Sequence, residues 1–63
     1  MKLIEQLAYL AYYSRQKIAV YPELQREINN IVQRAINKIE AGESFDYEVQ
    51  LAIQTIDDLI YNN

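Results

Sequence analysis

The chain has 63 residues, with 9 acidic and 6 basic side chains, a net charge of −3, and neither cysteine nor histidine. The absent residue types exclude disulfide scaffolds, zinc fingers, c-type haem and nucleophilic catalysis by Cys or His. The negative charge disfavours a general affinity for nucleic acid or anionic membranes, and an apolar share of 51% is too high for a disordered chain. We expect a single domain over residues 1–63, close to the lower size limit for folding without disulfides or metals.

The first predicted helix covers residues 2–19. Polar residues such as Glu5 and Gln6 interrupt any apolar run near its start, so we expect neither a signal peptide nor a membrane span. At about 100° per residue, its apolar and small side chains form one stripe along the helix. This stripe consists of Leu3, Ile4, Leu7, Leu10, Ala11, Ser14 and Ile18.

Tyr9, Tyr12, Tyr13 and Gln16 cluster on the side of this helix that faces away from the stripe. An amphipathic helix normally carries charges or amides there, because apolar area left in water gains nothing on folding. Tyrosine supplies a large rigid ring with a polar tip and is enriched at interface hot spots. We interpret these residues as a protein-interaction surface. The alternatives are rings that lie flat against the flanks of the bundle, or a small-ligand pocket.

The second predicted helix covers residues 22–41. Tyr21-Pro22 predicts the corner before it, since the residue preceding a proline is pushed out of the helical region and proline suits the first helical position. Gly42 stands where a left-handed cap would end the helix. Its core stripe consists of Leu24, Ile28, Ile31, Val32, Ala35, Ile36 and Ile39.

The outer side of the second helix carries arginine and amide side chains, the types that read base edges in a major groove. Presented after a short corner, they would suit a helix-turn-helix protein. Glu23, Glu27 and Glu40 on the same helix and the negative total charge argue against DNA, so we do not expect nucleic acid as a partner. A small dimeric DNA-binding regulator is therefore the alternative hypothesis. Its contact residues would be Arg26, Asn30, Gln33, Arg34 and Asn37.

The third predicted helix covers residues 45–61. Ser44 offers an N-cap, and Asp46 and Glu48 in the first turn favour the positive end of the helix dipole. The apolar residues again form one stripe. They are Phe45, Val49, Ala52, Ile53, Ile56, Leu59 and Ile60.

A second stripe of the third helix points outward and has the 4-3-4-3 spacing of a helix contact seam. It runs through Tyr47, Leu51, Gln54, Asp58 and Tyr61. Leu51 lies too far from the core stripe to be buried within one bundle, although a single exposed leucine is common. We interpret Tyr47, Leu51 and Tyr61 as further candidates for an interface, with incidental surface as the alternative.

Acidic residues gather around the second link and at Asp57-Asp58. Their spacing matches no calcium-binding loop, and adjacent helical residues point about 100° apart. Helix capping and solubility account for them, so we expect no metal, no cofactor and no catalytic pair of acids. The acids around the link are Glu40, Glu43, Asp46 and Glu48.

The segment Gln54-Thr55-Ile56-Asp57-Asp58-Leu59-Ile60 resembles the Q-x-L-D-x-L-I core of the small helical phosphatases that dephosphorylate sporulation response regulators. That resemblance implies a two-helix hairpin, whereas this chain has a third predicted helix. Ile53 also stands where that motif has a serine. We interpret the seven residues as ordinary amphipathic helix and carry no function over.

The short links predict an all-α, compact three-helix bundle of antiparallel neighbours. The alternative is a long helical hairpin whose third helix packs on a second subunit, and dimerisation could also complete the core of the bundle. The main functional hypothesis is a small, non-enzymatic, cytoplasmic protein-interaction module: a regulator, inhibitor or adaptor, of a size found among phage and mobile-element inhibitors. We expect it to bind another protein or itself as a homodimer, and no small-molecule substrate.

Overall fold

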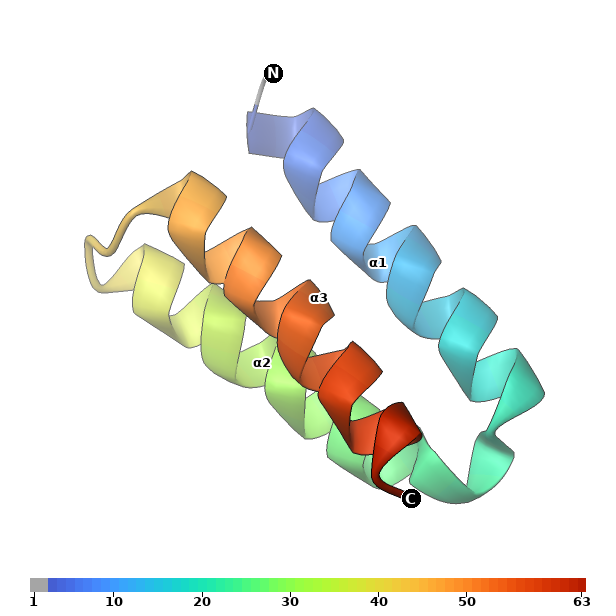
Figure 1. The fold of residues 1–63 in the computed structure, drawn as a ribbon. Helices are drawn as coiled ribbons and strands as arrows, with labels where there is room; N and C mark the ends of the chain where they lie inside the picture. Colours follow the sequence, from blue (N-terminus) through green and yellow to red (C-terminus); the bar gives the residue numbers. More distant parts are fainter. Residues whose placement is uncertain (1–2) are drawn as a thin grey trace.

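Three α-helices joined by short links pack side by side in the computed structural model, which describes the backbone of residues 3–63 and the side chains from Glu5 onward (Figure 1). They are α1 (Leu3–Val20), α2 (Gln25–Glu40) and α3 (Phe45–Tyr61), and a 3-10 turn, η1 (Pro22–Leu24), precedes α2. Successive helices run antiparallel, so α1 and α3 point the same way. The predicted all-α bundle is confirmed, and the third helix packs on its own chain.

The link between α1 and α2 is a tight corner at Tyr21. The N–H of Leu24 donates to the carbonyl of Tyr21 at 2.9 Å, which closes the 3-10 turn. Pro22 was expected to open the second helix, and it opens this turn instead, so α2 begins three residues later. The tighter turn suits the corner because it reverses the chain within few residues. Tyr21 itself is half-buried and packs against the core.

The link between α2 and α3 contains the predicted left-handed cap. Gly42 has φ of +102°, its N–H donates to the carbonyl of Ile39, and the N–H of Glu43 donates to the carbonyl of Lys38, each at 3.0 Å. This pair of hydrogen bonds is the Schellman arrangement, which satisfies the last free carbonyls of a helix. The Ser44 hydroxyl then accepts from the N–H of Tyr47 at 3.4 Å, so the predicted N-cap of α3 is confirmed.

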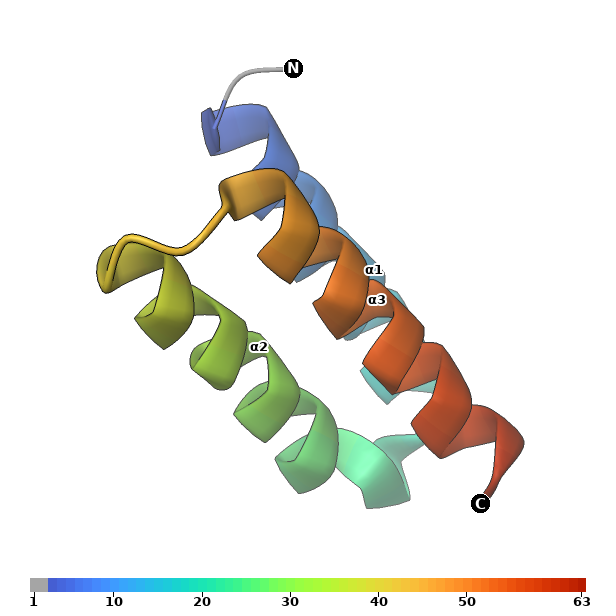
Figure 2. The same cartoon turned by 60° about the vertical axis from the view of Figure 1, so that its left-hand side comes forward.

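Two clusters of buried side chains form the core, and each joins all three helices directly or through its neighbours. The helix α3 contributes to both clusters because it lies against α1 on one side and α2 on the other (Figure 2). Burial of these side chains is the main favourable term in folding. The Leu10 cluster consists of Leu10, Ala35, Val49 and Ala52, and the Ile28 cluster of Leu24, Ile28 and Ile56.

The helix α1 is rotated relative to its predicted stripe. Leu10 and Ser14 are buried as expected, but Leu7 and Ala11 are exposed. Tyr13, expected on the outer side, packs against the Ile28 cluster. The apolar side chains of α1 spread over a wide arc, so the predicted stripe alone does not fix the orientation of the helix. Contacts with α3 determine which side of α1 is buried.

Replacement of Gly42 tests the second corner. Gly42→Ala should lower the free energy of unfolding by about 1 kcal/mol, because a side chain at this φ is strained. An added Cβ meets nothing within 4 Å, so the cost is conformational rather than steric. Gly42→Asn should cost less, since asparagine tolerates the left-handed region. Urea unfolding measures both variants, and unchanged stability of Gly42→Ala would contradict the capping role.

Candidate protein-interaction site

Two of the three predicted aromatic residues of α1 lie on the surface. Tyr9 is 52% exposed and Tyr12 is 56% exposed, and Gln16 is exposed one turn beyond Tyr12. Val20, which the sequence reasoning placed in no site, is 66% exposed one turn beyond Gln16. The four-residue spacing from Tyr12 through Gln16 to Val20 is the signal that could have identified it. We call Tyr9, Tyr12, Gln16 and Val20 the α1 face.

Tyr13 was expected on the outer side of the helix with Tyr9 and Tyr12, but it is not exposed as they are. Its ring is half-buried against the Ile28 cluster, and its hydroxyl donates a hydrogen bond to a carboxylate oxygen of Asp57 on α3. Burial, followed by this hydrogen bond and the charge of Asp57, raises the pKa of Tyr13 from 10.0 to about 12. Tyr13 therefore fastens α1 to α3.

A column of side chains runs along the same edge of α1. The rings of Tyr9 and Tyr13 lie 6.2 Å apart between centroids, tilted by 41°, and the Nζ atom of Lys17 lies 5.1 Å from the centroid of Tyr13. Tilted ring pairs and a cation over a ring are both attractive arrangements. Tyr13 thus orients Tyr9 as well as α3.

A groove between α1 and α3 adjoins the ring of Tyr9. It has a volume of about 170 Å³, below the 300–1,000 Å³ typical of small-molecule sites, and suits a single side chain. The Nε2 atom of Gln6 donates to an Asp46 carboxylate oxygen at this groove, while the Oε1 atom of Gln6 is buried without a partner in the described part of the chain. The groove is lined by Gln6, Tyr9, Asp46, Val49, Gln50 and Ile53.

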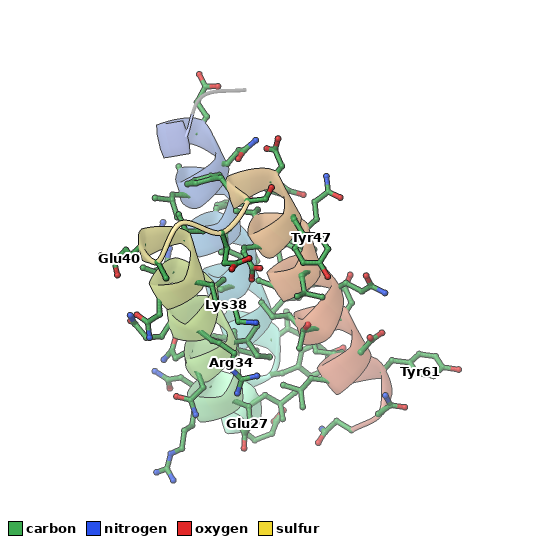
Figure 3. All side chains as sticks on the ribbon, turned by 90° about the vertical axis from the view of Figure 1, so that its left-hand side faces the viewer. Glu27, Arg34, Lys38, Glu40, Tyr47 and Tyr61 are labelled. Carbon is green, nitrogen blue, oxygen red and sulfur yellow. The ribbon has the colours of Figure 1, made fainter. Side chains whose placement is uncertain are left out.

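The predicted outward stripe of α3 lies on another face of the bundle (Figure 3). We call this surface the α2–α3 face, and it consists of Tyr47, Leu51 and Tyr61 of α3 with Arg34 and Lys38 of α2. Tyr47 is 62% exposed, Tyr61 is 88% exposed and Leu51 is 37% exposed. Leu51 lines a small hollow of about 90 Å³ with Arg34 and Lys38 of α2. The structure therefore divides the predicted interface residues between two surfaces.

Glu48 was predicted as a helix-capping acid, and it lies in this hollow with only 4% of its surface exposed. Arg34 and Lys38 extend from α2 toward α3 (Figure 3) and belong to the same hollow. In the chain from residue 5 onward, none of the three side chains has an ion-pair partner within 4.0 Å. A carboxylate buried beneath two cations is a charge arrangement that α2 and α3 create together.

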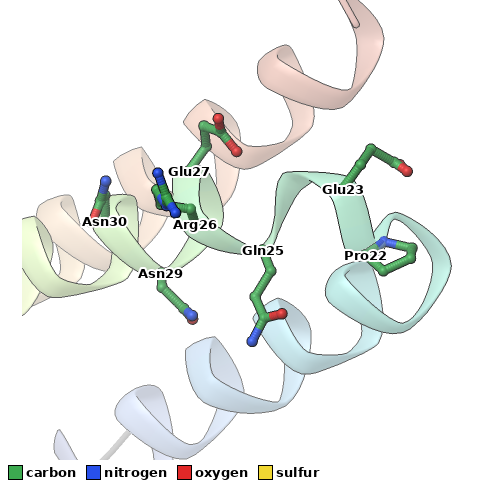
Figure 4. Close-up of a pocket in the computed structure, with 7 residues that line it drawn as sticks. All are labelled: Pro22, Glu23, Gln25, Arg26, Glu27, Asn29 and Asn30. Atoms are coloured by element: carbon green, nitrogen blue, oxygen red, sulfur yellow. The ribbon is translucent and has the colours of Figure 1, made fainter.

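The polar residues predicted to contact DNA are all exposed along α2, and three of them border a hollow. Arg26 and Asn30 line an open hollow of about 640 Å³ at the start of α2, together with Glu23 and Glu27 (Figure 4). The lining residues come from a single stretch, residues 22–30, so they cannot enclose a ligand. Of the remaining three, Arg34 faces the other hollow, and Gln33 donates to Asn37 at 3.0 Å.

Two further properties concern metals and membranes. Within the described residues, no group of three or more acidic side chains is placed to hold a metal ion. Among the helices the structure describes, none is both long enough and apolar enough to span a membrane.

Comparison with protein-family models, curated proteins and solved structures finds no match for this chain. The segment 54–60 thus shares a short pattern with the sporulation phosphatases without a wider family match. In the structure Ile56 is buried, Leu59 and Ile60 pack against the Ile28 cluster, and Asp57 accepts the Tyr13 hydroxyl. These residues therefore have structural roles within the bundle.

The hydrogen bond between Tyr13 and Asp57 predicts a pH dependence of stability. The folded state holds the Tyr13 proton more tightly than the unfolded state, so this contribution is complete below pH 10.0 and is lost as the pH rises to about 12. Tyr13→Phe should remove this part of the alkaline decline and lower the free energy of unfolding at neutral pH by about 1 kcal/mol.

Urea unfolding at a series of alkaline pH values measures the effect. Tyr12→Phe is the matched control, because its hydroxyl makes no hydrogen bond in the described part of the chain. An alkaline decline of the same size in Tyr13→Phe and in the wild type would contradict the assignment.

Proposed function

We propose that this protein is a small non-enzymatic interaction module, a regulator, inhibitor or adaptor, that binds another protein through the α1 face. The observation that supports it is the exposure of Tyr9 and Tyr12, each with more than half of its surface in solvent. The exposed part of each ring gains nothing from folding, whereas burial against a partner removes that apolar area from water.

The groove beside Tyr9 supports the same proposal. A ring at the edge of a groove, with apolar Val49 and Ile53 in its lining, is the setting in which interface hot spots occur. The exposed carboxylate of Asp46, which accepts from Gln6, is a hydrogen-bond acceptor at this groove. A partner side chain with an aliphatic stem and an N–H donor at its tip, such as lysine or arginine, would complement the groove.

The mechanism follows from mass action. Binding to the α1 face stabilises the partner conformation that fits this face. Binding also blocks the part of the partner's surface that the α1 face covers. With about 2 kcal/mol for each hot-spot residue, a few such anchors suffice for micromolar binding.

The DNA-binding alternative has no comparable support. The open hollow with Arg26 places this cation beside Glu23 and Glu27, so its charged side chains carry a net negative charge. A surface that binds the phosphate backbone of DNA needs a net positive charge.

Loss of the exposed rings should abolish partner binding. With the wild-type chain immobilised as bait in an extract of the source cells, we expect a bound protein that is lost with the Tyr9→Ser/Tyr12→Ser variant. Tyr61→Ser is the matched control, because it removes a tyrosine with 88% exposure from another face. With the purified partner, Tyr12→Ser alone should weaken binding by about thirtyfold, the equivalent of about 2 kcal/mol.

Two outcomes would count against the proposal. Equal retention of the same proteins by the wild type and the double variant would remove the role of the α1 face. Retention of DNA that falls steeply with salt and is lost with Arg26→Ala would favour the nucleic-acid alternative.

A further inference from the structure

The α2–α3 face carries a concentration of positive charge in an acidic protein. The chain has a net charge of −3, yet Arg34 and Lys38 are both exposed at one hollow and have no ion-pair partner within 4.0 Å in the described residues. Glu48 offsets one of these charges from below but is almost completely buried. The accessible rim of the hollow is therefore cationic.

The same face provides apolar anchors beside the cations. Leu51 lines the hollow and is 37% exposed, and Tyr47, one turn before it on α3, is 62% exposed (Figure 3). Further along the same stripe, Asp58 is exposed, and its carboxylate has no partner among the described residues. One stripe thus carries apolar anchors and an acid, with two cations beside the anchors.

We propose that this face binds a second copy of the chain, with the two α3 helices antiparallel across a two-fold axis near Gln54. In this arrangement position 58 of one copy lies level with position 50 of the other, next to the hollow that contains Arg34 and Lys38. Asp58 of each copy then pairs with these cations of the other copy. Tyr47 of each copy lies beside Tyr61 of the other, and the two Leu51 side chains lie near the centre.

The distribution of charge selects a second copy as the occupant. A two-fold interface brings the same patch of both molecules together, so each charge must find its opposite within that patch. Here the negative Asp58 and the positive Arg34 and Lys38 lie on the same face. The proposed two-fold axis brings Asp58 of each copy next to the two cations of the other. Contact along little more than one helix is at the small end of protein interfaces, so we expect dissociation constants on the order of 10–100 µM.

This self-association uses a different surface from the α1 face and does not depend on the proposed function. Each proposal can therefore fail alone. A dimer formed through α2 and α3 leaves Tyr9 and Tyr12 available to a different protein, so a partner could be bound twice by one dimer.

Sedimentation equilibrium over a dilution series tests the dimer. The wild type should change from monomer to dimer in the stated range, and Asp58→Arg should weaken the dimer by about tenfold or more, because two opposite-charge contacts become repulsive. Glu40→Arg is the matched control with the same charge change. It lies on the far edge of α2 (Figure 3) and should leave the dimer unchanged.

A mixture of two variants provides the decisive measurement. Arg34→Glu alone should also weaken the dimer, but an equimolar mixture of Arg34→Glu and Asp58→Arg should associate as strongly as the wild type. In the mixed dimer the introduced glutamate of one chain meets the introduced arginine of the other, and the native Asp58 meets the native Arg34. Circular dichroism of each variant shows whether the bundle is folded, and restored association in the mixture cannot arise from misfolded chains.

Any of four outcomes would overturn the proposal. The first is a wild type that stays monomeric up to about 1 mM, a weak-binding limit. The second is a dimer that Asp58→Arg leaves unchanged. The third is a dimer that Tyr12→Ser dissociates, since association would then occur through the α1 face. The fourth is a pair of folded single variants whose mixture does not restore association, which would exclude the charge pairing.

Discussion

The packing of α3 against both other helices is the contact on which the rest of this structure depends. Both core clusters contain residues of α3, and Ile56 and Val49 are the points at which it joins them. Only three large side chains in the described part of the chain are fully buried, and they are Leu10, Ile28 and Ile56. A bundle of this size has little interior relative to its surface, so much of its aromatic area is left outside.

The α1–α3 edge is where folding and the proposed function meet. Tyr13 is held by Asp57, and its ring lies against that of Tyr9, which adjoins the groove with Gln6 and Asp46. The same contacts that fasten α1 to α3 therefore hold one wall of the candidate binding groove in place. A partner would meet a ring with restricted motion, which lowers the entropy lost on binding.

The α2–α3 edge has a different character. Two alanines, Ala35 and Ala52, belong to the cluster between these helices, and the hollow above them exposes cations rather than rings. The buried carboxylate of Glu48 lies in the same hollow, and its negative charge attracts the positive charges of Arg34 and Lys38. The molecule thus presents an α1 face without charged side chains and an α2–α3 face that combines Tyr47 and Leu51 with two cations, and the two faces suit different partners.

Residues in α1 show how far the sequence could predict the candidate site. Tyr9, Tyr12 and Gln16 are exposed as expected, because they lie far around the helix from its buried positions, Leu10 and Ser14. Tyr13 lies at the edge of the exposed side of α1, so a small rotation of the helix decides whether its ring is exposed to solvent or packs against the core. Periodicity defines an arc only approximately, and the hydrogen-bond partner of Tyr13 is 44 residues away in the chain.

The sequence by itself determined where the two links between the helices lie. Pro22, Gly42 and Ser44 act on the backbone of their immediate neighbours, so their effects do not depend on the rest of the fold. Only the tertiary structure decided how far α1 rotates and that Arg34 and Lys38 face α3 rather than the outer side of α2. These depend on contacts between distant segments, because burial against another helix outweighs the weak directional preference of any single amphipathic stripe.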